Sequence, residues 1–223
     1  MRNRKRSNDM NAVSGQYGPD REGKKQGRRI AAVMILCILG IFLLLATLQN
    51  FLTALKPAVD IAYLLDHGAG EGMHVAGRVP YTYDCFADMT ETARGRVQAY
   101  YYALPAAEGI IVLAVSPEKK KAMDILLEET FDYLESGYLP ETVVEVEGYV
   151  EKARGRLPYL LSQYMEDIGY TKEEVEAMGE PLMIREAADS LHKARILAPV
   201  GMILLASGVL LAMFFVLCRK KEA

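Results

Sequence analysis

Two long stretches without a charged side chain constrain this sequence more than any other feature. They cover residues 30–55 and 196–218. Each exceeds the roughly 20 apolar residues that a helix needs to cross the hydrocarbon core of a bilayer. We therefore expect two membrane-spanning helices, so the lipid bilayer is the first partner that the sequence predicts.

A cleavable secretory signal is the alternative for the first stretch. Such a signal has an apolar part of about 7 to 15 residues, followed by a small-residue cleavage site. Residues 30–55 form a longer run, so we expect an uncleaved anchor. Ala46 and Ala54 are the small residues at which processing stays an alternative.

The distribution of Lys and Arg predicts the orientation of the chain. Five of these side chains lie within residues 21–29, only Lys56 closely follows the first stretch, and residues 219–221 are basic after the second. Basic flanks of membrane spans stay on the cytoplasmic side. We therefore expect a plasma-membrane protein with both termini cytoplasmic and residues 56–195 extracytoplasmic.

The segment between the two stretches is acidic. Residues 56–195 contain 14 Lys and Arg against 25 Asp and Glu, a net charge of −11. Binding to nucleic acid needs clustered cations, so we expect no nucleic acid as a partner. The two apolar stretches contain no acidic, basic or histidine side chain that could form an ion or proton path, so we do not expect transport.

Small residues recur on one side of the second predicted span. Gly201, Gly208 and Ala212 are separated by seven and four positions. Small side chains allow two membrane helices to approach closely. The sequence leaves two explanations open, which are packing against the first span and formation of a homodimer.

The segment between the spans combines strand and helix patterns. Alternating or wholly apolar runs predict strands at residues 73–79, 81–86, 96–104, 109–115, 143–150 and 182–184. Amphipathic runs predict helices at residues 57–66, 117–136, 158–168 and 171–178. The expected fold class is α+β, with two transmembrane helices flanking a small curled β-sheet or OB-like barrel domain with peripheral helices; an open α+β sheet is the alternative.

Two of these helices have clear boundary signals. Ser116 and Pro117 suit the start of the helix at residues 117–136, and Gly137 suits its end. Its expected buried stripe consists of Met123, Leu126, Leu127, Thr130, Phe131 and Leu134. Thr171, three positions before a glutamate, predicts a capping box for the later helix.

The expected organisation has seven segments. In chain order they are a flexible basic cytoplasmic tail (1–29), the first transmembrane helix (30–55), a juxtamembrane helix and Gly-rich linker (56–72), an extracytoplasmic α+β domain (73–186), a helical lead-in (187–195), the second transmembrane helix (196–218) and a cytoplasmic tail (219–223). The first tail is expected to be flexible because it has too few apolar side chains to offset the entropy of ordering.

Three short motifs accompany this organisation. They are Glu-Gly-Met-His-Val at residues 71–75, Tyr-Asp-Cys-Phe-Ala at 83–87 and Tyr-Tyr-Ala-Leu-Pro at 101–105. Set between two apolar spans, they resemble motifs of functionally uncharacterised two-pass membrane proteins of Gram-positive gut bacteria. The resemblance extends from residue 30 onward. It implies a location and an architecture but no reaction.

Side chains suited to catalysis do not converge in the sequence. Cys85 is the only cysteine between the spans, and its alternation with neighbouring tyrosines favours a core position. A nucleophilic Cys85 would need a base such as His74. The acidic, histidine and cysteine side chains there lack a recognised metal-ligand spacing. We therefore expect no catalytic residue, metal or cofactor, and an enzyme is less expected than a binding protein.

Tyrosines are the best candidates for recognition. Tyr100 and Tyr102 should share one face of a strand and Tyr101 the other. A tyrosine offers apolar area with a polar tip, which suits an interface. The interaction candidates are therefore Tyr83, Tyr100, Tyr102 and Cys85, with ordinary sheet packing as the alternative.

The function that these features favour is a membrane-tethered extracytoplasmic interaction or binding module, with a protein or other ligand as its partner. A membrane-bound cell-envelope enzyme is the alternative from another class, and an accessory subunit of a membrane complex is a third. A deep pocket that gathers at least three reactive side chains would favour the enzyme. The side chains in question are His74, Arg78, Tyr83, Asp84 and Cys85.

Overall fold

The computed structural model describes residues 19–222 apart from residues 92–94 and 108, and the side chains of residues 19–26, 29 and 218–222 lie outside this description. The chain forms two compact units. One unit joins Met1–Leu45 to Pro199–Ala223, and the other is Ala46–Ala198. Each unit is described by itself below.

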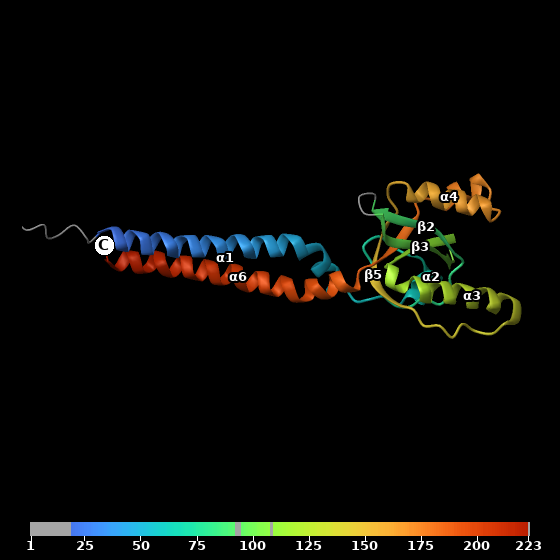
Figure 1. Ribbon diagram of the computed structural model, residues 1–223, viewed down its shortest axis with the longest axis horizontal. Helices are drawn as coiled ribbons and strands as arrows, with labels where there is room; N and C mark the ends of the chain where they lie inside the picture. The colour runs from blue at the N-terminus through green and yellow to red at the C-terminus, as the bar shows by residue number, and fades with distance from the viewer. Residues whose placement is uncertain (1–18, 92–94, 108, 223) are drawn as a thin grey trace, which may run out of the picture. The chain divides into compact units, whose positions relative to one another are not determined.

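The first unit is a pair of long helices that pack against each other (Figure 1). They belong to α1 (Pro19–Ala54) and α6 (Ala188–Glu222). Glycines allow a close approach, because a Cβ added at Gly201 would lie 3.2 Å from the Gly40 carbonyl oxygen. One added at Gly208 would lie 2.6 Å from a sulfur atom of α1. The expectation that small residues of the second span pack against the first is confirmed.

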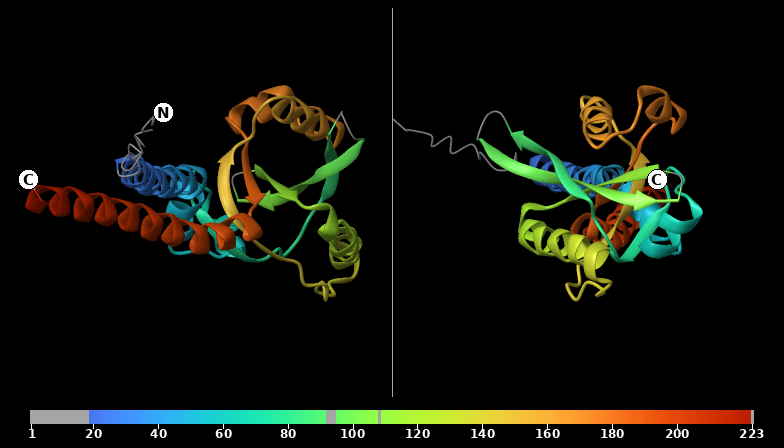
Figure 2. Two further views of the ribbon diagram at one scale, coloured as in Figure 1. Left: turned by 60° about the vertical axis from the view of Figure 1, so that its left-hand side comes forward. Right: turned by 90° about the vertical axis from the view of Figure 1, so that its right-hand side faces the viewer.

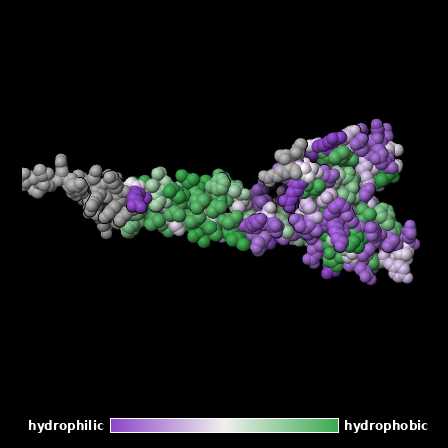
Figure 3. Space-filling view, in the orientation of Figure 1, coloured by the Kyte–Doolittle hydropathy of each residue, from purple (hydrophilic) through white to green (hydrophobic). Residues whose placement is uncertain are grey.

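Both helices are apolar and mostly exposed. The runs Ile30–Ala54 and Ala188–Leu217 are long and apolar enough to cross a bilayer. Ile38, Phe42 and Leu210 are each 66% exposed, and Figure 3 shows the apolar surface that such side chains form along the helices. Soluble proteins rarely expose so large a contiguous apolar surface. The helix pair therefore favours membrane association.

The first helix begins earlier than the first apolar stretch. Its start at Pro19 makes residues 19–29 helical, whereas a flexible tail was expected over residues 1–29. Residues 1–18 of that expected tail lie outside the described residues. Extending an existing helix avoids the cost of nucleation, so the polar residues before the apolar stretch can continue the same helix.

The second unit is built on a six-stranded mixed sheet (Figures 1 and 2). Its strands are β1 (His74–Arg78), β2 (Asp84–Glu91), β3 (Arg96–Ala106), β4 (Gly109–Val115), β5 (Glu145–Lys152) and β6 (Leu182–Glu186). They lie in the order β1-β5-β6-β4-β3-β2, and all neighbours are antiparallel except β4 and β6. β2 extends to Glu91, beyond the strand expected at residues 81–86, because it stays paired with β3 up to Arg96.

The sheet is open, so the expected OB-like barrel is wrong and the open α+β alternative is confirmed. Within the described part of the chain, β1 and β2 are the two edges and do not pair with each other. β6 joins the two halves of the sheet, because it pairs in parallel with β4 and antiparallel with β5. Closure would need hydrogen bonds between β1 and β2, and these strands lie at opposite ends of the strand order.

Helices cover both faces of the sheet. On one face lie α2 (Ile61–His67) and α3 (Lys120–Ser136), and on the other lie α4 (Leu157–Asp167) and α5 (Lys172–Ala177). A short 3-10 turn, Pro117–Lys119, precedes α3. Figure 2 shows α3 and α4 on opposite sides of the strands. The α2–α3 face and the α4–α5 face are named after these helices below.

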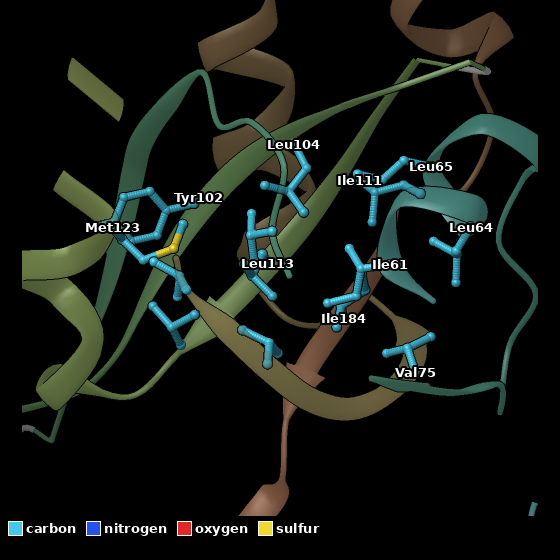
Figure 4. Close-up of a cluster of buried hydrophobic side chains, with 14 of the residues drawn as sticks. Ile61, Leu64, Leu65, Val75, Tyr102, Leu104, Ile111, Leu113, Met123 and Ile184 are labelled. Atoms are coloured by element: carbon cyan, nitrogen blue, oxygen red, sulfur yellow. The ribbon is translucent and has the colours of Figure 1, made fainter. Parts of the chain in front are cut away.

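The central strand β4 contributes to both cores. Leu113 and Val115 are buried on the α2–α3 face, where Leu113 lies among side chains of α2, α3 and neighbouring strands (Figure 4). Val112 and Ala114 are buried on the α4–α5 face. Successive side chains of a strand point to opposite faces, so a strand covered on both sides must be apolar throughout.

The end of α3 and the capping box of α5 are confirmed, but α3 starts later than expected and its buried stripe is shorter. Pro117 begins the 3-10 turn instead, and Ser116 forms no side-chain cap hydrogen bond there. Gly137 ends α3 in the left-handed conformation, and Thr171 forms the capping box of α5. Along α3 the burial stops at Thr130, whereas Phe131 and Leu134 are 49% and 62% exposed. The expectation that these two are buried is wrong because the last turns extend past the buried cluster.

Candidate functional site

A mostly apolar pocket of about 300 Å³ lies beside α4 and α5 and is called the apolar pocket below. Ala69, Ala106, Ile111 and Leu182, which belong to the cluster of the α2–α3 face, also line it. α4 contributes Leu161 and Met165, which are four residues apart and therefore share one side of the helix. Ile110 of β4, Val175 of α5 and Met178 after it complete the apolar walls. Pockets of this size and composition suit small ligands.

Small residues leave the space that the pocket occupies. Gly68, Ala69 and Ala106 line it without filling it. Gly109 has φ +126° and lies so close to Met178 that an added Cβ would be 2.8 Å from its Sδ. The glycine therefore lets the methionine close one side of the pocket.

Among the described lining residues, two carboxylates and a hydroxyl are the side-chain polar groups of the pocket. They belong to Glu176, Glu180 and Ser162. Glu180 forms an ion pair with Lys152, whose ammonium group lowers the pKa of the Glu180 carboxyl. No ion pair among the described residues involves Glu176, and no Lys, Arg or His is among the described lining residues. The pocket therefore carries an uncompensated negative charge.

Three of the four interaction candidates come together on the α2–α3 face. Cys85 pairs with Tyr102 across β2 and β3, and both lie against the core with Tyr100. Tyr102 donates a hydrogen bond to Asp124 Oδ1 at 2.7 Å, and Lys120 Nζ lies 2.5 Å from Asp124 Oδ2. Tyr102 has no exposed surface, so its ring contributes to packing.

The surroundings of Cys85 raise the pKa of its thiol. Burial raises the pKa of Cys85 more strongly than the Lys120 ammonium lowers it. The thiolate is the nucleophilic form, so a raised pKa works against reactivity at neutral pH. The expected base His74 is engaged elsewhere: its Nδ1 lies 2.9 Å from the Lys56 carbonyl oxygen and its Nε2 lies 3.1 Å from Glu147 Oε1.

Tyr83 lies apart from the other candidates, in an open groove of about 340 Å³. Tyr81 and Tyr133 also line this groove, and their rings stack with centroids 5.3 Å apart. Burial raises the pKa of Tyr81, and the adjacent Tyr133 hydroxyl raises it further. Among the described lining residues, the groove combines three tyrosines with one carboxylate, Asp66, and is therefore an aromatic surface.

The reactive side chains expected for an enzyme are scattered. Among the described residues, Tyr83 lines the aromatic groove and Arg78 lines a third cavity, whereas Asp84, His74 and Cys85 line none of the three. No group of three His, Cys, Asp or Glu side chains in the described part of the chain could hold a metal ion.

The apolar pocket was not predicted from the sequence. The spacing of Leu161 and Met165 marks the buried side of α4, but an unfilled cavity gives no such pattern. A cavity depends on which distant side chains meet, and here the small residues come from the α2–β1 loop and the end of β3.

Comparisons with known proteins identify one family. A family model described as Domain of unknown function (DUF8577) matches residues 22–219. No curated protein and no solved structure matches the chain.

Proposed function

This chain belongs to the family described as Domain of unknown function (DUF8577), and on that premise we propose that it is a membrane-tethered extracytoplasmic binding module. Its binding site is the apolar pocket, and its ligand is a small, largely apolar molecule. Its two apolar helices anchor it in the plasma membrane with both ends cytoplasmic. An enzyme is not favoured, because the candidate reactive groups are scattered.

The observation that carries this proposal is the form of the pocket. Its walls are mostly apolar, and a few polar groups lie among them. A preformed cavity lowers the free-energy cost of ordering that binding would otherwise require. Burial of apolar ligand area contributes roughly 25 cal/mol per Å² before such costs are subtracted.

The orientation rests on charge and can be tested separately. Tyr138 is 80% exposed in the second unit, and Gly27 is exposed on α1 before the apolar run. In a background in which Cys37, Cys85 and Cys218 are all replaced by Ala, Tyr138→Cys should react with a membrane-impermeant maleimide in intact cells, whereas Gly27→Cys should react only after permeabilisation. The reverse pattern would contradict the proposed orientation.

Binding can be followed with a single tryptophan, because the chain contains none. Met178 lines the pocket and is 36% exposed, so Met178→Trp places a reporter at the site. Tyr159→Trp is the matched control on α4, since Tyr159 is 56% exposed and outside the pocket lining. Both full-length variants are reconstituted into phosphatidylcholine liposomes and titrated with 1-octanol.

A saturable blue shift is expected for the Met178→Trp emission and not for the Tyr159→Trp emission. Adding Ser162→Phe to the first variant should fill the pocket and abolish the shift. Equal responses of the two reporters would mean partition into the bilayer only. That result, or a response that survives Ser162→Phe, would contradict binding in the pocket.

A further inference from the structure

We propose that the apolar pocket selects amphiphilic amines, which are small molecules with an apolar body and one ammonium group. This inference rests on the proposed function and names the ligand class of the same site. Apolar walls alone would not distinguish cationic, neutral and anionic amphiphiles, so the charges of the pocket must select among them.

The charges of the pocket carry the inference. Glu180 is already compensated by Lys152, whereas Glu176 has no ion-pair partner among the described residues. A ligand ammonium group beside Glu176 would form the ion pair that the chain does not supply. A carboxylate or phosphate in the same place would meet the uncompensated like charge of Glu176.

The surroundings act in the same direction. Residues 56–195 have a net charge of −11, so the field of this segment attracts cations and repels anions. An anionic lipid or fatty acid is therefore disfavoured before it reaches the pocket.

The walls determine the rest of the ligand. Leu161, Met165 and Ile110 offer aliphatic contacts, and the volume of about 300 Å³ suits a short alkyl chain rather than a full lipid. Glu176 lies in the last turn of α5, and Glu180 lies in the segment that follows this helix. A ligand with its alkyl chain against α4 and its ammonium group beside Glu176 satisfies both parts of the pocket.

The experiment compares three eight-carbon ligands at neutral pH with the full-length Met178→Trp reporter in phosphatidylcholine liposomes. They are octylamine, 1-octanol and octanoate, which share an alkyl chain and differ in charge. Octylamine should bind about fivefold more tightly than 1-octanol, as expected for one ion pair at a partly exposed site, and octanoate should bind more weakly than 1-octanol.

The decisive variant is Glu176→Gln. It should reduce the preference for octylamine over 1-octanol to about twofold or less. Glu173→Gln is the matched control, because Glu173 lies on α5, changes the net charge equally and does not line the pocket. It should leave the preference intact.

The outcomes separate the two proposals. Equal affinities for octylamine and 1-octanol, or equal effects of the two glutamine variants, would overturn the inference and leave the binding function standing. If no ligand gives a saturable response specific to Met178→Trp, the proposed function itself fails. If octanoate binds most tightly, the charge selection is the opposite of the one proposed.

Discussion

The two faces of the central sheet share the same strands but are filled to different extents. On the α2–α3 face, Leu113, Met123 and Ile184 are completely buried in one continuous cluster. The α4–α5 face has a smaller cluster, and beside it lies the apolar pocket of about 300 Å³. Dense packing specifies a single structure, whereas an unfilled space can admit a ligand.

The difference comes from the helices rather than from the strands. β4 presents buried apolar side chains to both faces. α3 spans Lys120–Ser136, whereas α5 spans only Lys172–Ala177. Because α5 is short and small residues lie opposite it, part of the second face stays open. We therefore expect most of the stability to come from the α2–α3 face and recognition to come from the other.

The largest effect is expected in the strand pairing that both faces share. A Cβ added at Gly148 would lie 2.0 Å from the Arg185 carbonyl oxygen, so Gly148→Ala must separate β5 from β6. The free energy of unfolding should fall by more than about 3 kcal/mol. Pulse proteolysis of the full-length protein in liposomes measures it. Gly70→Ala is the control, because its Cβ would make an ordinary contact.

A pair of leucines compares the two faces directly. Leu113→Ala should lower the free energy of unfolding by about 3 to 5 kcal/mol, because the cavity forms inside a filled core. Leu161→Ala should cost about 2 kcal/mol, since Leu161 already borders a cavity that can hold water or ligand. Equal losses in the same proteolysis assay would mean that the faces do not differ in packing.

Acid should weaken the α2–α3 face through the carboxyl of Asp124. Burial acts to raise the pKa of the Asp124 carboxyl, but the hydrogen bonds from Lys120 and Tyr102 outweigh it and lower the pKa below its ordinary value. A lowered pKa contributes stability above the unfolded-state pKa that is lost as the pH falls through the folded-state value. This contribution should be about 1 kcal/mol or less, because the ion pair is partly exposed.

The Asp124→Asn variant tests this pH dependence. Unfolding curves at neutral pH and at pH 3 should differ less for the variant than for the unmodified chain. Glu173→Gln is the control, since Glu173 is an exposed carboxylate on α5 and forms no ion pair among the described residues. An unchanged acid dependence in Asp124→Asn would show that the network does not contribute.

The smallest effect is expected at the mouth of the pocket. Glu176→Gln removes an exposed charge with no ion-pair partner among the described residues, so the free energy of unfolding should change by less than about 0.5 kcal/mol. Ligand preference should nevertheless change, as proposed above. A large loss of stability would assign Glu176 to the fold instead of to recognition.

Much of the fold could be predicted because its signals are local. The absence of charge over residues 30–55 and 196–218 predicted the long helices, and the apolar run Gly109–Val115 predicted β4. Gly137 and the capping box at Thr171 marked helix ends. Each signal depends on neighbours in sequence, where the backbone and its side chains are tied by short-range geometry.

The candidate site could not be predicted in the same way. The tyrosine pattern led to Tyr102, which is fully buried, and to Tyr83 in a separate groove. The apolar pocket was missed because its lining comes from α4, α5, β4 and the loop after α2. Expected strand patterns likewise allowed either a barrel or an open sheet.

The sequence alone determined that this chain has two apolar helices and an acidic α+β segment between them, since apolar runs, charge and periodicity are properties of neighbouring residues. Only the tertiary structure decided that β6 lies between β4 and β5, that the sheet is open and that one face keeps a pocket. These features depend on which distant segments pair and how completely their side chains fill the space between them, and no local pattern contains that information.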